Sequence, residues 1–240
     1  MLNEPKISAL PSRRTGLAHF RNGESQTAQL FARLRDDIMA GRLEPGRKLK
    51  IDELRKRYDA GASPLREALS TMCSDGLVER IDQRGFRVAD VSIDDFNELL
   101  KTRCWLEERA LRESIAHGGT EWEEALVLAH HRLSRQARTG RRGNLRLDED
   151  WEAAHRDFHM SLIAACGSNI MIRFCDQLYD RNIRYRNISG TAAYPKRDID
   201  AEHRQIFEAA LNHDADEAVR LLVAHYEATG DYFRDALANN

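Results

Sequence analysis

Residues 51–88 carry the pattern that most restricts what this chain can fold into. Asp52–Tyr58 predicts a short helix, and Asp59-Ala60-Gly61-Ala62 predicts a tight turn in which Gly61 permits the reversal. A second helix is expected to open at Ser63-Pro64, because Ser63 can cap it and Pro64 suits its first position. Two short helices joined by such a turn are typical of a helix-turn-helix.

The second helix is amphipathic. Its inner face is apolar at helical spacing: Leu65, Ala68, Leu69 and Met72. Its outer face is small, polar and partly basic: Arg66, Ser70 and Ser74. Such a helix fits the major groove of DNA. We therefore predict DNA contacts from this end of the chain: Ser63, Pro64, Arg66 and Ser70.

A basic hairpin is expected to follow. Leu77–Ile81 and Phe86–Val91 predict two strands around a glycine-containing tip, Asp82-Gln83-Arg84-Gly85. This is the pattern of a wing, and it adds further predicted contacts to phosphate or the minor groove: Arg84, Gly85 and Arg87, with Lys48 from the extended link Lys48–Ile51. The alternative interpretation is a small α+β surface module that does not bind DNA.

The charge is unevenly distributed along the 240 residues. Residues 1–90 hold 17 Lys and Arg against 13 Asp and Glu, and residues 91–240 hold 20 against 26. A basic N-terminal part followed by an acidic remainder indicates a nucleic-acid-binding module joined to a part with another role. Residues 1–24 mix proline, glycine and basic residues without a period, and they predict a mobile arm.

The cysteines show no paired metal spacing and are expected to be reduced core residues: Cys73, Cys104, Cys166 and Cys175. No apolar run reaches the length of a membrane span, and the N-terminus shows no apolar signal segment. These features predict a cytoplasmic protein with no membrane partner.

Four short motifs resemble, in order and spacing, the N-terminal domain of the GntR family of bacterial transcription regulators. They are Gly41-Arg42-Leu43-Glu44-Pro45-Gly46, Ser63-Pro64-Leu65-Arg66-Glu67-Ala68-Leu69, Asp75-Gly76-Leu77-Val78 and Gln83-Arg84-Gly85-Phe86. The resemblance implies a winged helix-turn-helix over residues 25–92, with Ser25–Met39 as its first helix. Many members carry Ser-Arg-Thr-Pro before the recognition helix, whereas this chain has Gly61-Ala62-Ser63-Pro64. The operator is therefore expected to differ, with Arg66 carrying more of the contact.

From Ile93 onward the pattern is helical. The expected helices are Ile93–His117, Glu121–Arg138, Leu147–Cys166, Ile170–Ser189, Asp198–Asn212 and Asp216–Leu237. The chain is thus predicted to be mainly α, a winged helix-turn-helix followed by an all-α antiparallel bundle of six or seven helices. Residues 93–240 resemble the effector-binding, dimerising domain of the FadR branch of this family, of the FCD type.

Four histidines can meet at one level of this bundle. His155 and His159 are four residues apart and share a helix face. His203 and His225 lie equally far from the turn near Asp214, so an antiparallel helix pair places them at the same height. Neutral imidazoles suit a divalent metal, Zn²⁺ first, with Ni, Fe or Mn as alternatives. Histidines of the core or surface without a metal are the alternative.

The resemblance adds to this pattern. Many FCD domains bind a divalent metal through an acidic residue and a histidine four apart, followed by two histidines about 22 apart. His159, His203 and His225 match, whereas His155 stands where aspartate is usual. In the family the open metal positions take water or the carboxylate of a small organic acid. Arg103 matches an arginine near the effector cavity of relatives.

Two more arginines are candidates for binding the effector, Arg184 and Arg186, because guanidinium groups hold carboxylates with two hydrogen bonds. A surface or ion-paired position is the simpler interpretation for both.

Together these features predict a homodimeric, ligand-responsive regulator. We expect it to repress from a near-palindromic DNA operator and to be released by a small organic acid, although activation is possible. The alternative is a metal-responsive regulator in which the metal itself is the signal. A metal enzyme is not expected, because Glu152-x-x-His155 lacks a second copy: Leu222 precedes His225 by three.

Overall fold

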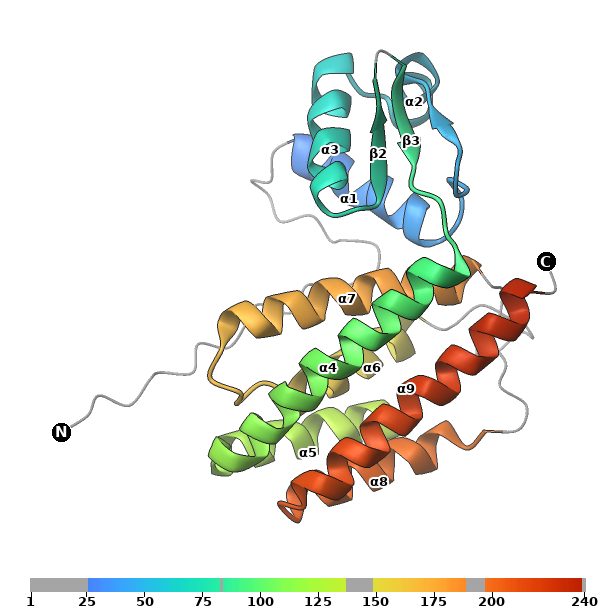
Figure 1. Cartoon of the computed structure of the whole chain (residues 1–240). Coiled ribbons are helices and arrows are strands. Elements are labelled where there is room, and N and C mark those ends of the chain that lie inside the picture. The colour runs from blue at the N-terminus through green and yellow to red at the C-terminus, as the bar shows by residue number, and fades with distance from the viewer. Residues whose placement is uncertain (1–25, 83, 137–148, 189–196, 239–240) are drawn as a thin grey trace.

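The computed structural model describes residues 26–82, 84–136, 149–188 and 197–238 (Figure 1). The predicted arm at residues 1–24 lies outside them, as does Ser25. The N-terminal domain consists of α1 (Gln26–Met39), β1 (Lys48–Leu49), α2 (Ile51–Tyr58), α3 (Ala62–Ser74), β2 (Val78–Ile81) and β3 (Gly85–Val88). This is a winged helix-turn-helix, as predicted.

The wing contains a third strand that the sequence did not indicate. The antiparallel sheet has the order β1-β3-β2, with Leu49 opposite Phe86 and Val78 opposite Val88. The predicted extended link is therefore β1, and its Leu49 is buried against the core of the domain. That core lies between the apolar faces of α1 and α3 and the inner side of the sheet: Leu34, Ile38, Leu65, Leu69, Met72, Phe86 and Val88.

The turn before α3 differs from the prediction in two ways. The helix begins at Ala62 with Gly61 as its N-cap residue, so Ser63 lies inside the first turn and does not cap it. The reversal is made by Asp59, which has φ 50°, whereas Gly61 has an extended φ of −69°. Aspartate tolerates the left-handed conformation better than most residues, so the turn does not need its glycine for this purpose.

The C-terminal domain is an all-α bundle, and the mainly α fold class is confirmed. In the described part of the chain it has six helices: α4 (Ile93–His117), α5 (Thr120–Ser134), α6 (Glu149–Leu162), α7 (Asn169–Ile188), α8 (Ile199–Leu211) and α9 (Ala215–Ala238). Helix α6 ends before the predicted Cys166, because its last residues tighten into short turns ahead of Gly167, whose φ is +73°. Helix α5 ends at Ser134, earlier than the predicted Arg138, with Arg135 as its C-cap residue.

Helix α7 lies at the junction of the two domains (Figure 1). It packs beside α4 in the bundle and against α1 of the winged domain. Tyr179 and Ile183 of α7 belong to the same apolar cluster as the winged-domain core. An ion pair between Arg35 and Asp180 and a hydrogen bond from Asn187 Nδ2 to the carbonyl oxygen of Met39, at 2.9 Å, also cross the junction.

No helix among the described residues is long and apolar enough to span a membrane. The four cysteines are free thiols, with Cys166 and Cys175 buried and the other two partly exposed.

Candidate metal and DNA-binding sites

The structure brings the four predicted metal ligands together inside the bundle. Helix α6 supplies His155 and His159, α8 supplies His203 and α9 supplies His225. All four are buried, and one ring nitrogen from each lies within 4.8 Å of the others. The Nε2 atoms of His155 and His159 are 3.1 Å apart. Two nitrogens bound to one zinc ion at tetrahedral or right angles would be separated by about 2.9–3.4 Å, so this spacing fits a shared metal.

The helices that carry these histidines are held in register by local structure. Helices α8 and α9 form an antiparallel pair around a tight turn at His213 and Asp214. The Asp214 carboxylate caps α9 by accepting from the backbone N–H of Glu217 at 3.0 Å. The turn therefore fixes the equal heights of His203 and His225.

Three of the histidines are oriented through Nδ1. His155 Nδ1 is 2.5 Å from the Tyr179 hydroxyl, His159 Nδ1 is 2.9 Å from the Tyr226 hydroxyl, and His225 Nδ1 is 2.7 Å from Glu202 Oε2. The two hydroxyls donate their own protons onward, Tyr179 to Glu152 and Tyr226 to Glu107. Each hydroxyl oxygen is then an acceptor for a histidine Nδ1–H.

This arrangement selects one tautomer. When Nδ1 carries the proton, the lone pair of a neutral imidazole is on Nε2. The Nε2 lone pairs of His155 and His159 then face each other across 3.1 Å, which is unfavourable unless a cation lies between them. Hydrogen bonds from Nδ1 to a hydroxyl or carboxylate are also what orients histidine ligands in metal sites. The donor chemistry of the cluster therefore fits a bound metal.

Burial keeps these histidines neutral. Loss of solvent lowers the pKa of His155 and His159 well below the ordinary histidine value, and it lowers the pKa of His225 as well. Partial burial opposes ionisation of Glu202, but hydrogen bonds from His225 and Arg197 lower its pKa to about 2. Neutral imidazole nitrogens suit Zn²⁺, Ni²⁺ or Fe²⁺ better than Mn²⁺, which favours oxygen ligands.

The predicted effector arginines lie in three different environments. Arg103 is only 3% exposed; its Nε donates to Glu107 at 2.6 Å, and its guanidinium lies 4.0 Å from the centre of the Tyr226 ring. Its Nη2 is buried and has no hydrogen-bond partner among the described residues. Arg186 is buried and paired with Glu152, on the His155 side of the cluster.

Arg184 is not placed at the cluster. It lies at the junction of the domains, where its Nη2 donates to the carbonyl oxygen of Ala89. It projects from another face of α7 than Tyr179 does, so the structure does not support it as an effector ligand. Neither Arg184 nor Arg186 is a surface residue, since each is 5% exposed. The ion-paired alternative therefore describes Arg186 alone.

The sequence did not indicate the groups that surround the histidines. Tyr179 lies on α7, where only Arg184 and Arg186 were predicted to bind a ligand. Tyr226 directly follows His225 in the chain, and Glu202 directly precedes His203. Glu107 stands one helical turn after Arg103, a spacing that favours an ion pair. That spacing is the one signal that could have identified a member of this set.

The predicted DNA-contacting side chains lie on exposed parts of the winged domain. Ser63, Arg66 and Ser70 are exposed on α3, with Pro64 partly buried between them. Arg84 and Gly85 are exposed at the tip of the wing, where Gly85 has φ +94°.

Arg87 is less available to DNA than the sequence suggested. Its guanidinium is 2.6 Å from Glu79 and 3.4 Å from Asp90. Lys48 lies opposite it on β1 and is exposed.

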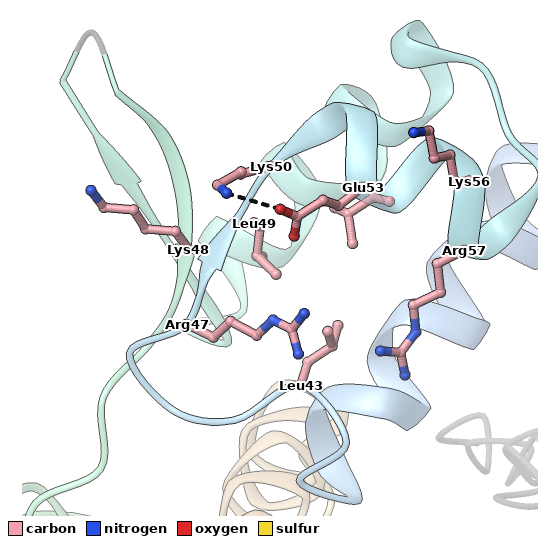
Figure 2. A pocket seen from close by; sticks show the side chains of 9 residues that line it. Leu43, Arg47, Lys48, Leu49, Lys50, Glu53, Lys56 and Arg57 are labelled. Carbon is pink, nitrogen blue, oxygen red and sulfur yellow. Dashed lines mark hydrogen bonds and ion pairs between the residues drawn. The ribbon is translucent and has the colours of Figure 1, made fainter.

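A basic groove of the winged domain is lined by residues of β1 and α2 and of the loop before β1 (Figure 2). Its volume is about 430 Å³, and its floor consists of Leu43, Leu49 and Leu54. Five cationic side chains line it: Arg47, Lys48, Lys50, Lys56 and Arg57. Glu53 is the single anion of the lining and is bonded to Lys50 at 2.9 Å. Such a groove is suited to the phosphates of a nucleic acid.

A winged helix-turn-helix joined to a helical bundle with a buried polar site is the architecture of a ligand-binding transcription regulator. Comparison with known proteins agrees. Residues 26–88 match the family described as bacterial regulatory proteins, gntR family, and residues 98–228 match the FCD domain. This chain belongs to the GntR family of bacterial transcription regulators and carries an FCD domain.

Two curated relatives cover most of the chain. The uncharacterized HTH-type transcriptional regulator BphR of Paraburkholderia xenovorans is 40% identical over 87% of this chain and 85% of its own length. The HTH-type transcriptional repressor GlaR of Escherichia coli is 31% identical over 86% of this chain and 95% of its own. The matched families and relatives are transcription regulators and not enzymes, so the prediction that the chain is no enzyme is confirmed.

Two solved structures share the fold. A putative transcriptional regulator GntR from Rhodococcus sp. RHA1 superposes with a TM-score of 0.67 at 22% identity, covering 89% of this chain and 99% of that one. E. coli McbR/YncC superposes with a TM-score of 0.68 at 18% identity, covering 88% and 98%. At this identity the likeness concerns the fold alone.

Proposed function

We propose that the protein is a homodimeric, cytoplasmic repressor that is released from a near-palindromic operator by a small organic acid. The acid would bind beside a divalent metal held by His155, His159, His203 and His225. One observation carries the proposal: neutral imidazoles that are oriented through Nδ1 turn their Nε2 atoms toward one another in a buried space. A relative of 31% identity that is named a repressor supports the sense of the regulation.

A metal in this position would supply open coordination sites for a carboxylate oxygen. Arg103 is suited to hold the same ligand, because its Nη2 is a buried donor without a partner among the described residues. Leaving such a donor unpaired costs about 1–3 kcal/mol, and an anionic ligand would remove that cost. The ring of Tyr226 lies between Arg103 and His159, contacting both.

The site is connected to the winged domain through α6 and α7. His155 contacts Tyr179, which packs in the winged-domain core. The next residue on each helix repeats the connection: Arg156 bonds Asp180 at 2.6 Å, and Asp180 is also paired with Arg35 of α1. A metal or ligand bound at the histidine cluster could move α6 against α7. Such a movement would shift the contact of Tyr179 with the winged-domain core and the ion pair between Asp180 and Arg35. An effector that prefers one position of α7 would shift the population of winged-domain arrangements.

Dimerisation would use the outer surface of α4 and α7, which pack side by side (Figure 1). Three large apolar side chains on these helices are more than half exposed: Trp105 at 61%, Ile170 at 62% and Phe174 at 55%. Exposed apolar groups of this size commonly mark interfaces. A two-fold dimer would present two recognition helices to two half-sites.

The experiment is a DNA-binding titration with DNA from upstream of the protein's own gene. Wild type and Arg66→Ala are compared over a range of salt, with zinc-loaded and metal-stripped protein, and with a panel of small organic acids. We expect tight wild-type binding, loss of specificity in Arg66→Ala, and release by an acid only when zinc is present. Weak binding by both proteins that follows salt alone would reject the recognition helix as the reader of this DNA.

The same titration distinguishes a regulator that responds to an organic acid from one that responds to the metal itself. If stripping the metal changed operator affinity and no acid had any effect, the metal itself would be the signal. If neither metal nor acid changed affinity, the histidine cluster would have no regulatory role.

A further inference from the structure

The charged groups around the histidine cluster cancel one another. Three arginines face the cluster, and each is paired with one glutamate. Arg103 bonds Glu107 at 2.6 Å, Arg186 is paired with Glu152, and Arg197 bonds Glu202 at 3.0 and 2.5 Å. The same three carboxylates accept the hydrogen bonds from Tyr226, Tyr179 and His225. These three ion pairs therefore bring no net charge to the cluster.

The four histidines add no negative charge to this balance. A neutral imidazole donates a lone pair but does not offset the charge of a metal. The largest electrostatic effects on His155, His159 and His225 come from those arginines, Glu202 and the other histidines. A divalent ion in the cluster would thus bring two positive charges that neither the histidines nor these three ion pairs compensate. An uncompensated charge is costly in a site from which water is excluded.

We propose that the effector is a small dicarboxylate whose two negative charges supply this balance. The inference rests on the proposed function and names the class of its ligand. One carboxylate would complete the metal's coordination. The second would accept from Arg103 Nη2, the buried donor that Glu107 leaves unused. Glu107 and Tyr226 fix the guanidinium in place, so it is preorganised for a planar carboxylate.

The chemistry of His155 is central to this selectivity. An aspartate at the same position would bring one negative charge into the first coordination shell, and a metal there would then need one further charge from its ligand. The wild-type site should favour a dianion, and an aspartate variant should lose that preference. His155→Asp therefore tests the effect of one added negative charge, and His155→Asn is its uncharged control of matched size.

The experiment measures binding of acids to full-length, zinc-loaded protein by calorimetry, after metal content has been determined directly. The acids are compared in pairs of equal carbon number: malonate with propanoate, succinate with butanoate, and glutarate with pentanoate. We expect at least one dicarboxylate to bind about tenfold or more tightly than its monocarboxylate partner. In His155→Asp this ratio should fall about tenfold, whereas in His155→Asn it should persist.

The possible outcomes distinguish a failure of the dicarboxylate inference from a failure of the proposed metal site. Zinc bound in stoichiometric amount, with mono- and dicarboxylates binding equally well, overturns the dicarboxylate inference and leaves the metal site intact. An unchanged ratio in His155→Asp overturns the charge argument. Absence of zinc in wild type overturns the metal site and the inference together. Arg103→Lys, which keeps the charge but loses the planar fork, should weaken dicarboxylates more than monocarboxylates.

Discussion

The hydroxyl of Tyr179 lies 2.5 Å from Nδ1 of His155, and the ring of Tyr179 packs in the core cluster of the winged domain. One side chain therefore contacts both the candidate metal site and the domain that binds DNA. Burial raises the pKa of this phenol well above its ordinary value, so it remains a neutral donor to Glu152. A change at His155 has a direct physical path to the winged domain through this ring.

Replacement of Tyr179 by phenylalanine should weaken the coupling between the two domains. The ring stays, but His155 loses the group that fixes its tautomer, and metal affinity should fall about 10- to 100-fold. Tyr226→Phe is the matched control, since it removes the equivalent hydroxyl from His159 but lies in the bundle core. We expect both variants to bind zinc less tightly. At saturating zinc, only Tyr179→Phe should show a reduced effect of effector on operator affinity, measured by fluorescence anisotropy. Equal responses in the two variants would argue against the path.

Asp180 should matter more than its neighbour Asp176. Arg156 is bonded to both carboxylates, but only Asp180 continues to Arg35 on α1. Asp180→Asn should therefore weaken the attachment of α1 to α7 and cost about 1.5–3 kcal/mol of stability, although the contacts of Ile183 and Asn187 remain. Asp176→Asn keeps the bridge between the domains. Hydrogen exchange in α1 reports the difference, and exchange that rose equally in both variants would contradict a specific role for Asp180.

The sequence allowed most of the fold to be predicted, because its signals are local. The apolar stripes of α4, α8 and α9 set their lengths to within one or two residues of the observed bounds. The third strand β1 was missed because two residues carry no period, and only pairing with β3 makes them a strand. The αL turn at Asp59 was assigned to Gly61 because glycine is the commoner residue in that conformation.

The histidine cluster could be anticipated because helix geometry converts sequence spacing into position. The four histidines needed only an antiparallel pair and one neighbouring helix. The surrounding groups could not be anticipated, because Tyr179 and Glu152 come from helices whose relative rotation is decided by packing. For the same reason the sequence could not separate Arg184 from Arg186, two residues apart on α7 and serving different sites.

Lys48 should contribute to DNA binding through phosphate attraction. It is exposed on β1 and forms no ion pair within the described part of the chain, whereas Lys50 nearby is bonded to Glu53 at 2.9 Å. Lys48→Gln should lower affinity for all sequences alike and reduce the slope of log K against log salt by about one. Lys50→Gln is the matched control and should change the slope less. A loss confined to one operator sequence would instead indicate a contact to a base.

Trp105 should be required for dimer formation. Its ring is 61% exposed on α4, so an acidic replacement places no charge in the core. Lys101 Nζ lies 4.8 Å from the ring centre. Trp105→Glu should convert the proposed dimer to a folded monomer, measured by sedimentation and circular dichroism. Val127→Glu on α5 makes the same kind of change at a side chain that is 46% exposed and should leave the dimer intact. A dimeric Trp105→Glu protein would exclude this surface.

Acid should destabilise the protein once its metal has been removed. Burial lowers the pKa of His155, His159 and His225 in the folded chain, and each returns to about 6.5 on unfolding. At a pH between the lowered pKa of the folded chain and the pKa of about 6.5 in the unfolded chain, the unfolded chain binds more protons than the folded chain. The free energy of unfolding should therefore fall as the pH drops below about 6.5, by up to about 1.4 kcal/mol per histidine and pH unit, and recover as the pH rises.

Urea unfolding in excess chelator at pH 5.5 and 7.5 checks this expectation, and equal stability at both would contradict it. His159→Gln should reduce the difference, whereas His117→Gln, at an exposed position, should not. The pH range from 5.5 to 7.5 also excludes Glu202 as the cause of a difference in stability. Its pKa is about 2 when folded and 4.5 ordinarily, so its contribution is complete above 4.5 and is lost only as the pH falls from there toward 2. A stability change between pH 5.5 and 7.5 that depends on His159 therefore reports the buried histidines.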